Sequence, residues 1–185
     1  MKALEEIDTK IKKDNIIDNI MKSKGLYCLV SNAKVGKSML ALQLSNAITN
    51  GKQFLGHNTM PSPTLYISTE SDSGQIMERI KILGLTFPKD SFFIIDRDGK
   101  GEVSIFDFEV DLLEFSKYKN GRFVIIDMLK DTNLGIDYDI NSYQDVGQKL
   151  LPKLRSICEK YNVTILFTHH LNKRGTTLGS TAFDA

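Results

Sequence analysis

The residues with the clearest chemical meaning form one segment of eight, Ser31-Asn32-Ala33-Lys34-Val35-Gly36-Lys37-Ser38. The segment lies between an apolar run at 25–30 and a helical pattern at 39–50, so the sequence predicts a strand, a loop and a helix in succession. Free backbone N–H groups at the start of a helix favour a bound anion, and this context is typical of a loop that cradles phosphate groups. The alternative is a chance Gly-Lys-Ser at the start of a helix.

Each residue type in this loop has a distinct expected task. The backbone N–H groups that would point at the phosphates belong to Ala33, Lys34, Val35, Gly36, Lys37, Ser38 and Met39. The Lys37 ammonium would reach the β and γ phosphates of ATP, and the Ser38 hydroxyl would bind the bridging Mg²⁺. The pattern usually opens with glycine, whereas this chain has Ser31, which fits the turn if its φ is negative.

Two carboxylates follow predicted strands at positions suited to nucleotide hydrolysis. Asp127 closes the apolar run 123–126, as in a strand buried on both faces, and would hold Mg²⁺ through its water shell. The next residue is Met128, so no second carboxylate adjoins Asp127. Glu70, at the end of the strand predicted over 64–69, is therefore the candidate general base. An aspartate that merely ends a buried strand is the alternative for Asp127.

Two adjacent histidines follow the last predicted strand, which covers residues 163–168. Neighbouring side chains on a strand point to opposite faces, so His169 and His170 are poorly placed to share one metal ion, and no third ligand is in evident register. We expect one histidine to face the terminal phosphate as a sensor and the other to be packed or solvated.

Length, charge and cysteine content limit the kinds of protein that this chain can be. The chain has 185 residues, enough for one α/β domain with a substantial core. Its formal net charge is +1, so the protein as a whole has no strong positive potential that would attract nucleic acid. Cys28 and Cys158 lack metal-ligand spacing and fit reduced core residues of a cytoplasmic protein. The sequence shows no apolar run of membrane-spanning length and no apolar region of a signal peptide, so we expect no membrane partner.

The remaining patterns supply the elements that must position these residues. Residues 1–24 have an approximately helical period of apolar side chains, and we expect amphipathic helices there that cap the core or pack on a neighbouring subunit. Residues 25–185 would form the core. Further helices are expected near 73–83, 108–118 and 142–160, with a bend at Pro152, and a further strand at 91–95. We expect a mostly parallel sheet with helices on both faces, and with the strands before the loop and before Asp127 near its centre.

Two other segments each allow two interpretations. Residues 96–107 have the acids and the glycine of a twelve-residue calcium loop, but Lys100 stands where a ligand oxygen is needed and a strand precedes the loop. We therefore favour a glycine-containing loop with solvent-exposed acidic residues.

The stretch 171–182 contains Lys173 and Arg174, which would contact a nucleic-acid backbone or a neighbour's nucleotide, or lie in a solvated loop.

Taken together, the motifs resemble those of the RecA-like ATPases, in particular the plasmid RepA-like and DnaB-like hexameric replicative helicases of plasmids, phages and mobile elements. The resemblance covers residues 25–185. Beyond the phosphate loop it rests on Gly51 to Gly56, Tyr66 to Glu70 with the following Ser-Asp-Ser-Gly-Gln, the strand ending at Asp127, and Thr168-His169-His170-Leu171-Asn172-Lys173 followed by Gly179-Ser180-Thr181-Ala182.

The resemblance implies roles for particular residues. Lys37 and Ser38 would be the ligands of ATP and Mg²⁺, and Lys37 would also act in catalysis. Glu70 would be the catalytic glutamate, Asp127 the Walker B acid and His170 the γ-phosphate sensor. Family cores usually continue into further strands that carry basic residues for the neighbour's site, so we expect a core that is incomplete at its C-terminus.

The resemblance also implies a function. Identical subunits would form a hexameric ring that hydrolyses ATP while it moves along single-stranded DNA or unwinds duplex DNA. Two alternatives stay open. One is a regulatory or recombination-accessory ATPase that assembles on DNA without helicase activity, and the other is a nucleotide-binding module that does not hydrolyse ATP.

Overall fold

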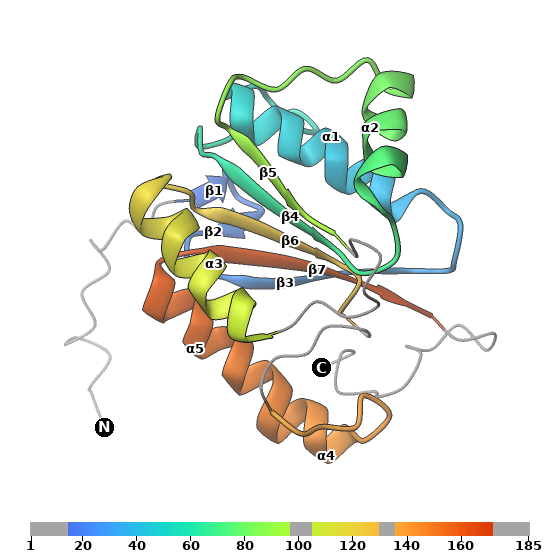
Figure 1. Ribbon diagram of the computed structural model, residues 1–185, viewed down its shortest axis with the longest axis vertical. Helices are drawn as coiled ribbons and strands as arrows, with labels where there is room; N and C mark the ends of the chain where they lie inside the picture. Colours follow the sequence, from blue (N-terminus) through green and yellow to red (C-terminus); the bar gives the residue numbers. More distant parts are fainter. Residues whose placement is uncertain (1–14, 97–104, 130–135, 172–185) are drawn as a thin grey trace.

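A five-stranded parallel sheet forms the centre of the chain (Figure 1). The computed structural model describes residues 15–96, 105–129 and 136–171. The strands are β3 (Leu26–Ser31), β4 (Thr64–Ser68), β5 (Phe92–Ile95), β6 (Phe123–Asp127) and β7 (Thr164–His170). Their order is β3-β7-β6-β4-β5, and every neighbouring pair is parallel. All residues of β4 and β6 are buried, as apolar runs covered on both faces require.

Helices cover both faces of this sheet, which confirms the predicted α/β fold class (Figure 1). On one face lie α1 (Lys37–Asn50) and α2 (Ser73–Ile82). On the other lie α3 (Ile105–Tyr118), α4 (Tyr143–Asp145), a π-helical turn η3 (Val146–Leu150) and α5 (Leu151–Tyr161). No helix within the described ranges is long and apolar enough to cross a lipid bilayer.

The N-terminal part of the described chain is a hairpin and not a helix. Strands β1 (Asn15–Ile17) and β2 (Met21–Lys22) pair antiparallel, so the helix expected over 1–24 is wrong for residues 15–22, and residues 1–14 lie outside the described residues. The β-branched side chains of Ile16 and Ile17 favour a strand, and both are buried in the apolar cluster that also contains residues of α1. Asn19 adopts a left-handed conformation with φ 61°, which suits the turn between the strands.

The strand that leads into the phosphate loop lies at an edge of the described sheet. Only β7 pairs with β3 among the described residues, so the expectation of a central β3 is wrong for this part of the chain. The strand that ends at Asp127 is central, as expected, because β6 lies between β7 and β4. The strands are parallel, so the carboxyl ends of β3, β7, β6 and β4 lie side by side at one end of the sheet. Open α/β sheets bind ligands at this end.

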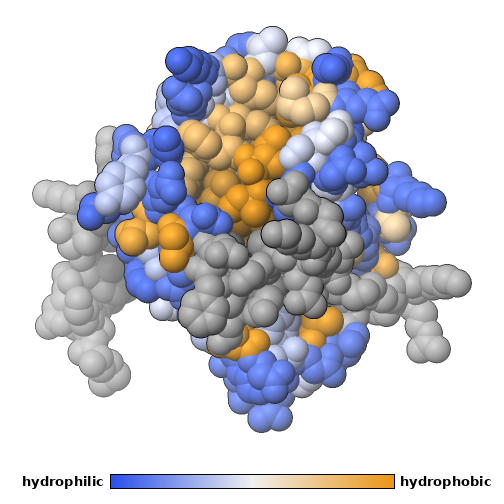
Figure 2. Space-filling view, in the orientation of Figure 1, coloured by the Kyte–Doolittle hydropathy of each residue, from blue (hydrophilic) through white to orange (hydrophobic). Residues whose placement is uncertain are grey.

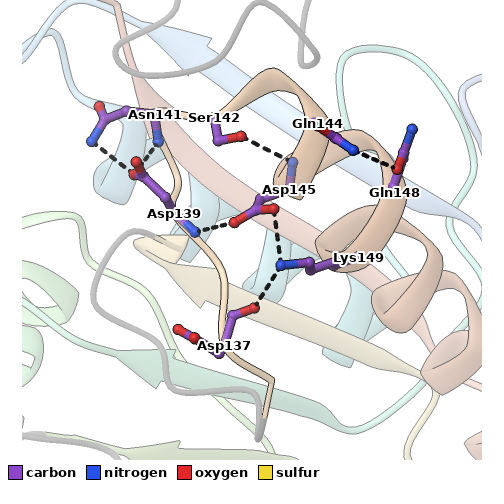
Figure 3. Close-up of polar contacts among 8 residues, drawn as sticks. All are labelled: Asp137, Asp139, Asn141, Ser142, Gln144, Asp145, Gln148 and Lys149. Atoms are coloured by element: carbon purple, nitrogen blue, oxygen red, sulfur yellow. Dashed lines mark hydrogen bonds and ion pairs between the residues drawn. The ribbon is translucent and has the colours of Figure 1, made fainter.

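The last helical segment is continuous and contains one wider turn. The backbone stays right-handed helical at Val146, Leu150 and Leu151, where α4, η3 and α5 meet. Pro152, which has no backbone N–H to donate, directly follows this wider turn, in which the Leu151 N–H donates to the Val146 carbonyl five residues back. Before η3, the Ser142 hydroxyl accepts a hydrogen bond from the backbone N–H of Asp145 at 3.2 Å and starts α4 (Figure 3). The expected helix over 142–160 is thus confirmed as one helical segment over 143–161, with a π-helical turn before Pro152.

At the opposite edge of the sheet from β3, apolar side chains gather over β5 (Figure 2). A cavity of 180 Å³ there is lined by Leu65, Phe93, Ile94, Ile95 and Phe115 together with Asp111, Glu114 and Lys119.

The two cysteines lie in the sheet and on α5. Cys28 is half-buried, whereas Cys158 is buried, and burial raises the pKa of its thiol to about 12.

Candidate functional site

The phosphate loop joins β3 to α1 through two residues with left-handed backbone conformations. Ser31 ends β3 in a strand conformation with a negative φ, so a serine is tolerated where the pattern usually has glycine. Lys34 has φ 63° and Gly36 has φ 97°. A Cβ on Gly36 would meet no atom within 4 Å, so glycine is needed there for its conformation and not for space. Helix α1 then begins at Lys37 with the free N–H groups of its first turn facing the loop.

The Lys37 side chain is buried, and its ammonium has three partners within the site. Its Nζ donates to the carbonyl oxygens of Ser31 at 3.1 Å and Asn32 at 2.9 Å, and lies 2.8 Å from His170 Nδ1. An ammonium has only donors, so His170 accepts through Nδ1 and carries its ring proton on Nε2. Burial lowers the pKa of Lys37, while the charges of Asp127 and Glu70 act in the opposite direction.

The two histidines at the end of β7 have different surroundings. His170 is half-buried and reaches Lys37, whereas His169 is buried. Successive residues of a strand face opposite sides of the sheet, which accounts for the difference. The structure therefore places His170, and not His169, beside the phosphate loop.

The Asp127 carboxylate is buried and held by two hydroxyl groups from neighbouring strands. Tyr66 donates to its Oδ2 at 2.5 Å from β4, and Thr168 donates to its Oδ1 at 2.7 Å from β7. Burial raises the pKa of the Tyr66 hydroxyl well above its usual range, and the negative charge of Asp127 raises it further. Sequence reasoning missed both partners. The available signal was a polar group inside an apolar, buried strand, because such a group needs a hydrogen-bonding partner.

Glu70 lies just beyond β4, at the edge of the sheet where β6 ends at Asp127. Strands β4 and β6 are in parallel register with Ser68 opposite Asp127, so the two acids project from the same edge. Thr69 links the two strand ends. Its hydroxyl accepts from the Met128 N–H at 2.9 Å and donates to the Met128 carbonyl at 2.8 Å. Glu70 itself is exposed to solvent.

These side chains line one pocket of 280 Å³. Its lining consists of Lys34, Gly36, Lys37, Ser38, Met39, Glu70, Arg79, Asp127, Thr168 and His170. Of the predicted loop residues, Ala33 is absent from this lining, and Val35 lies in a neighbouring hollow of 380 Å³ that shares Gly36, Lys37 and Met39. Sequence reasoning did not single out Arg79, because a basic residue in the last turn of a helix is common.

The pocket contains the groups that a magnesium-bound nucleotide needs. Mg²⁺ prefers hard oxygen ligands, and the Ser38 hydroxyl and the Asp127 carboxylate both line the pocket. The buried Lys37 ammonium and the start of α1 supply positive charge and N–H donors for phosphate. The residues present therefore fit ATP and Mg²⁺.

Other predicted residues lie elsewhere. Lys173 and Arg174 lie outside the described residues, as does most of the segment 96–107 with its resemblance to a calcium loop. Asp96 itself is described, and its carboxylate accepts hydrogen bonds from the backbone N–H and the hydroxyl of Ser73 at the start of α2. Within the described ranges no group of three or more His, Cys, Asp or Glu residues is arranged to hold a metal ion.

Comparison with known proteins adds a family and a fold. A sequence profile of a family described as an AAA domain matches residues 4–176. A KaiC-like protein from the hyperthermophilic archaeon Pyrococcus horikoshii OT3 has a similar structure, with a TM-score of 0.63 and 17% sequence identity over 92% of this chain and 72% of that chain. At this identity the similarity shows the fold alone. A comparison with curated proteins found no match.

Proposed function

Because the chain belongs to the AAA domain family and has the fold of a RecA-like P-loop ATPase domain, we propose that its pocket binds ATP with Mg²⁺ and hydrolyses it. The observation that supports this proposal is the common lining of the pocket by Lys37, Glu70, Asp127 and His170. Each comes from a different segment of the chain and would have its own role. Lys37 would bind the phosphates, and Glu70 would accept a proton from the attacking water. Asp127 would help to hold the metal ion, and His170 would sense the terminal phosphate.

Binding begins with the loop. The N–H groups at the start of α1 donate to phosphate oxygens, and the Lys37 ammonium moves from the loop carbonyls to the β and γ phosphates. Ser38 and Asp127 would hold Mg²⁺, Asp127 through water, and the ion would supply positive charge to neutralise the phosphates. Tyr66 and Thr168 keep the Asp127 carboxylate in a fixed orientation.

Hydrolysis uses Glu70 as the general base. Its carboxylate accepts a proton from a water molecule, and the oxygen of that water forms a bond to the γ phosphorus. The bond between that phosphorus and the β–γ bridging oxygen breaks, and the products are ADP and inorganic phosphate. His170 accepts from Lys37 in the present arrangement, and it would exchange this contact for the γ phosphate. The end of β7 would thereby respond to the presence of that phosphate.

The biological coupling rests on the resemblance described above. We propose a cytoplasmic ring of identical subunits, hexameric in form, that uses ATP hydrolysis to move along single-stranded DNA or to unwind duplex DNA during replication of a plasmid, phage or other mobile element. In this account Lys173 and Arg174, two and three residues beyond the end of the described chain at Leu171, contact DNA or a neighbour's nucleotide.

The test of this coupling is ATP turnover per subunit, measured across a range of protein concentrations with and without single-stranded DNA, together with separation of a labelled duplex. We expect turnover to rise with both protein and DNA and duplex to be separated. Turnover stimulated by DNA without strand separation would instead support the regulatory or recombination-accessory ATPase. ATP binding without turnover at any concentration would support the non-hydrolysing module.

A further inference from the structure

Arg79 lies on the wall of the nucleotide pocket, with no assigned task. It belongs to the last turn of α2 and is half-buried, and it lines the pocket together with Lys37, Glu70 and Asp127. Within the described part of the chain, its guanidinium makes no hydrogen bond or ion pair with another side chain. A guanidinium that faces a pocket without a protein partner is available to an anionic ligand.

The position of Arg79 is fixed by the packing of its helix. Ile76 and Ile80 are buried in the core between α2 and the sheet. The start of α2 is capped by Asp72, whose carboxylate accepts from the Gln75 N–H at 2.8 Å, and by Asp96. Lys81, on the same turn, is exposed and does not line the pocket. The two basic residues at the end of this helix therefore face different surroundings.

Arg79 also lies within electrostatic reach of the metal side of the pocket. Its charge lowers the pKa of the Tyr66 hydroxyl, against the larger effect of burial, and Tyr66 is one of the two residues that donate to Asp127. Arg79 thus lines the same pocket as Asp127, where the terminal phosphate and Mg²⁺ would lie, and it comes from α2 instead of from the phosphate loop.

We propose that Arg79 binds the terminal phosphate of ATP from within the same chain, an inference that rests on the proposed function of the pocket. The planar guanidinium donates two parallel N–H groups to phosphate oxygens, a geometry that a lysine cannot reproduce. Arg79 then distinguishes ATP from ADP, because ADP lacks the phosphate that it contacts. It does so without a residue from a neighbouring subunit.

The test is isothermal titration of the full chain, in the presence of Mg²⁺, with ADP and with the non-hydrolysable β,γ-imido analogue of ATP. Arg79→Gln should weaken binding of the analogue by about tenfold, as expected for loss of a charge-assisted hydrogen bond, and change binding of ADP by less than about twofold. Lys81→Gln, the matched control on the same turn, should leave both affinities unchanged.

The outcomes separate this inference from the proposed function. If the unaltered chain binds both nucleotides and Arg79→Gln binds the analogue equally well, Arg79 is only a cation near the end of α2 and the inference is overturned, while ATP binding stands. If the unaltered chain binds neither nucleotide, both proposals are overturned. Should Arg79→Gln fail to fold, Arg79→Lys is the deciding variant, because lysine keeps the positive charge but lacks the two parallel N–H groups of the guanidinium. Binding of the analogue should then weaken while binding of ADP stays the same. An unchanged affinity for the analogue would overturn the inference.

Discussion

At the scale of single residues, the environment of Asp127 shows how neutral groups prepare a buried carboxylate for a metal. Tyr66 and Thr168 each occupy one oxygen of the carboxylate and fix its orientation. Neither carries a charge under ordinary conditions, so neither would compete with Mg²⁺ as a cation would. Supporting groups of this kind commonly change metal affinity by about tenfold or more when removed.

Tyr66→Phe removes one of these two hydroxyls and keeps the ring in the core. We expect the Mg²⁺ concentration for half-maximal ATP hydrolysis to rise by about tenfold, because the carboxylate loses one of the groups that orient it. Titration of activity with Mg²⁺ measures this. Tyr27→Phe is the matched control, since the Tyr27 hydroxyl accepts from the Lys22 N–H in another part of the fold. An unchanged Mg²⁺ dependence in Tyr66→Phe would contradict the role of this hydrogen bond.

At the scale of secondary-structure elements, Glu109 joins α3 to α5. Its carboxylate accepts from Lys153 at 2.8 Å, Lys160 at 2.7 Å and Tyr161 at 2.6 Å. The hydrogen bonds from Lys153, then Lys160 and Tyr161, lower the pKa of Glu109 to about 2. A carboxyl whose pKa is lower in the folded chain than in the unfolded chain stabilises the fold in its ionised form.

The stability contributed by Glu109 should therefore depend on pH. It is complete above the ordinary pKa of 4.5 and is lost as the pH falls toward about 2. Glu109→Gln should lower the free energy of unfolding at neutral pH by about 1 kcal/mol, a value reduced for solvent screening of a partly exposed group. Urea unfolding at neutral and acidic pH measures the difference, which should shrink in acid. Glu114→Gln, an exposed residue of the same helix, is the control. A difference that is equal at both pH values would contradict this account.

The entry to α4 is organised by local hydrogen bonds among polar side chains (Figure 3). Asp145 accepts from the Asp139 N–H at 2.9 Å and pairs with Lys149 at 2.9 Å, while Asp139 accepts from the Asn141 N–H at 2.8 Å.

Ser142→Ala removes the side-chain cap and should lower the free energy of unfolding by about 1 kcal/mol. Chemical denaturation measures this loss. Ser156→Ala, at an exposed position within α5, should be neutral or slightly stabilising, and equal effects of the two substitutions would rule out the cap.

The sequence predicts those elements whose signals are local. The strand, loop and helix around Lys37 were predictable, since an apolar run, a glycine and a helical period follow one another without a gap. The hairpin at 15–22 was not, because Ile16, Ile17 and Met21 fit a helical period as well as a strand, and burial in the apolar core shared with distant segments decides between them. Tyr66, Thr168 and Arg79 escaped prediction because their place in the site depends on how distant segments come together.

At the scale of the whole molecule, the site exists only when the sheet is assembled. Lys37 and His170 are in contact although 133 positions separate them in the chain, and the pairing of β3 with β7 brings them together. A ligand of this pocket therefore binds the folded chain and not the unfolded chain. Such a ligand must stabilise the fold by mass action.

Nucleotide should accordingly raise the stability of the chain. MgATP at one hundred times its dissociation constant should increase the free energy of unfolding by about 2.7 kcal/mol, measured as a shift of the thermal or denaturant midpoint. Lys37→Ala removes the ammonium that the phosphates require, so this variant should show a much smaller shift. Equal shifts in the two proteins would place the nucleotide outside the pocket described here.

The most direct test of the account is steady-state MgATP hydrolysis by the unaltered chain and by Glu70→Gln, with ATP binding measured on the same samples. We expect turnover in the unaltered chain, a loss of about one hundredfold or more in Glu70→Gln because the general base is gone, and similar ATP affinities in both. Glu78→Gln, an exposed acid of α2 that does not line the pocket, should retain turnover. Equal turnover in Glu70→Gln and the unaltered chain would contradict the assignment of Glu70, and an unaltered chain that binds no ATP would contradict the proposed function as a whole.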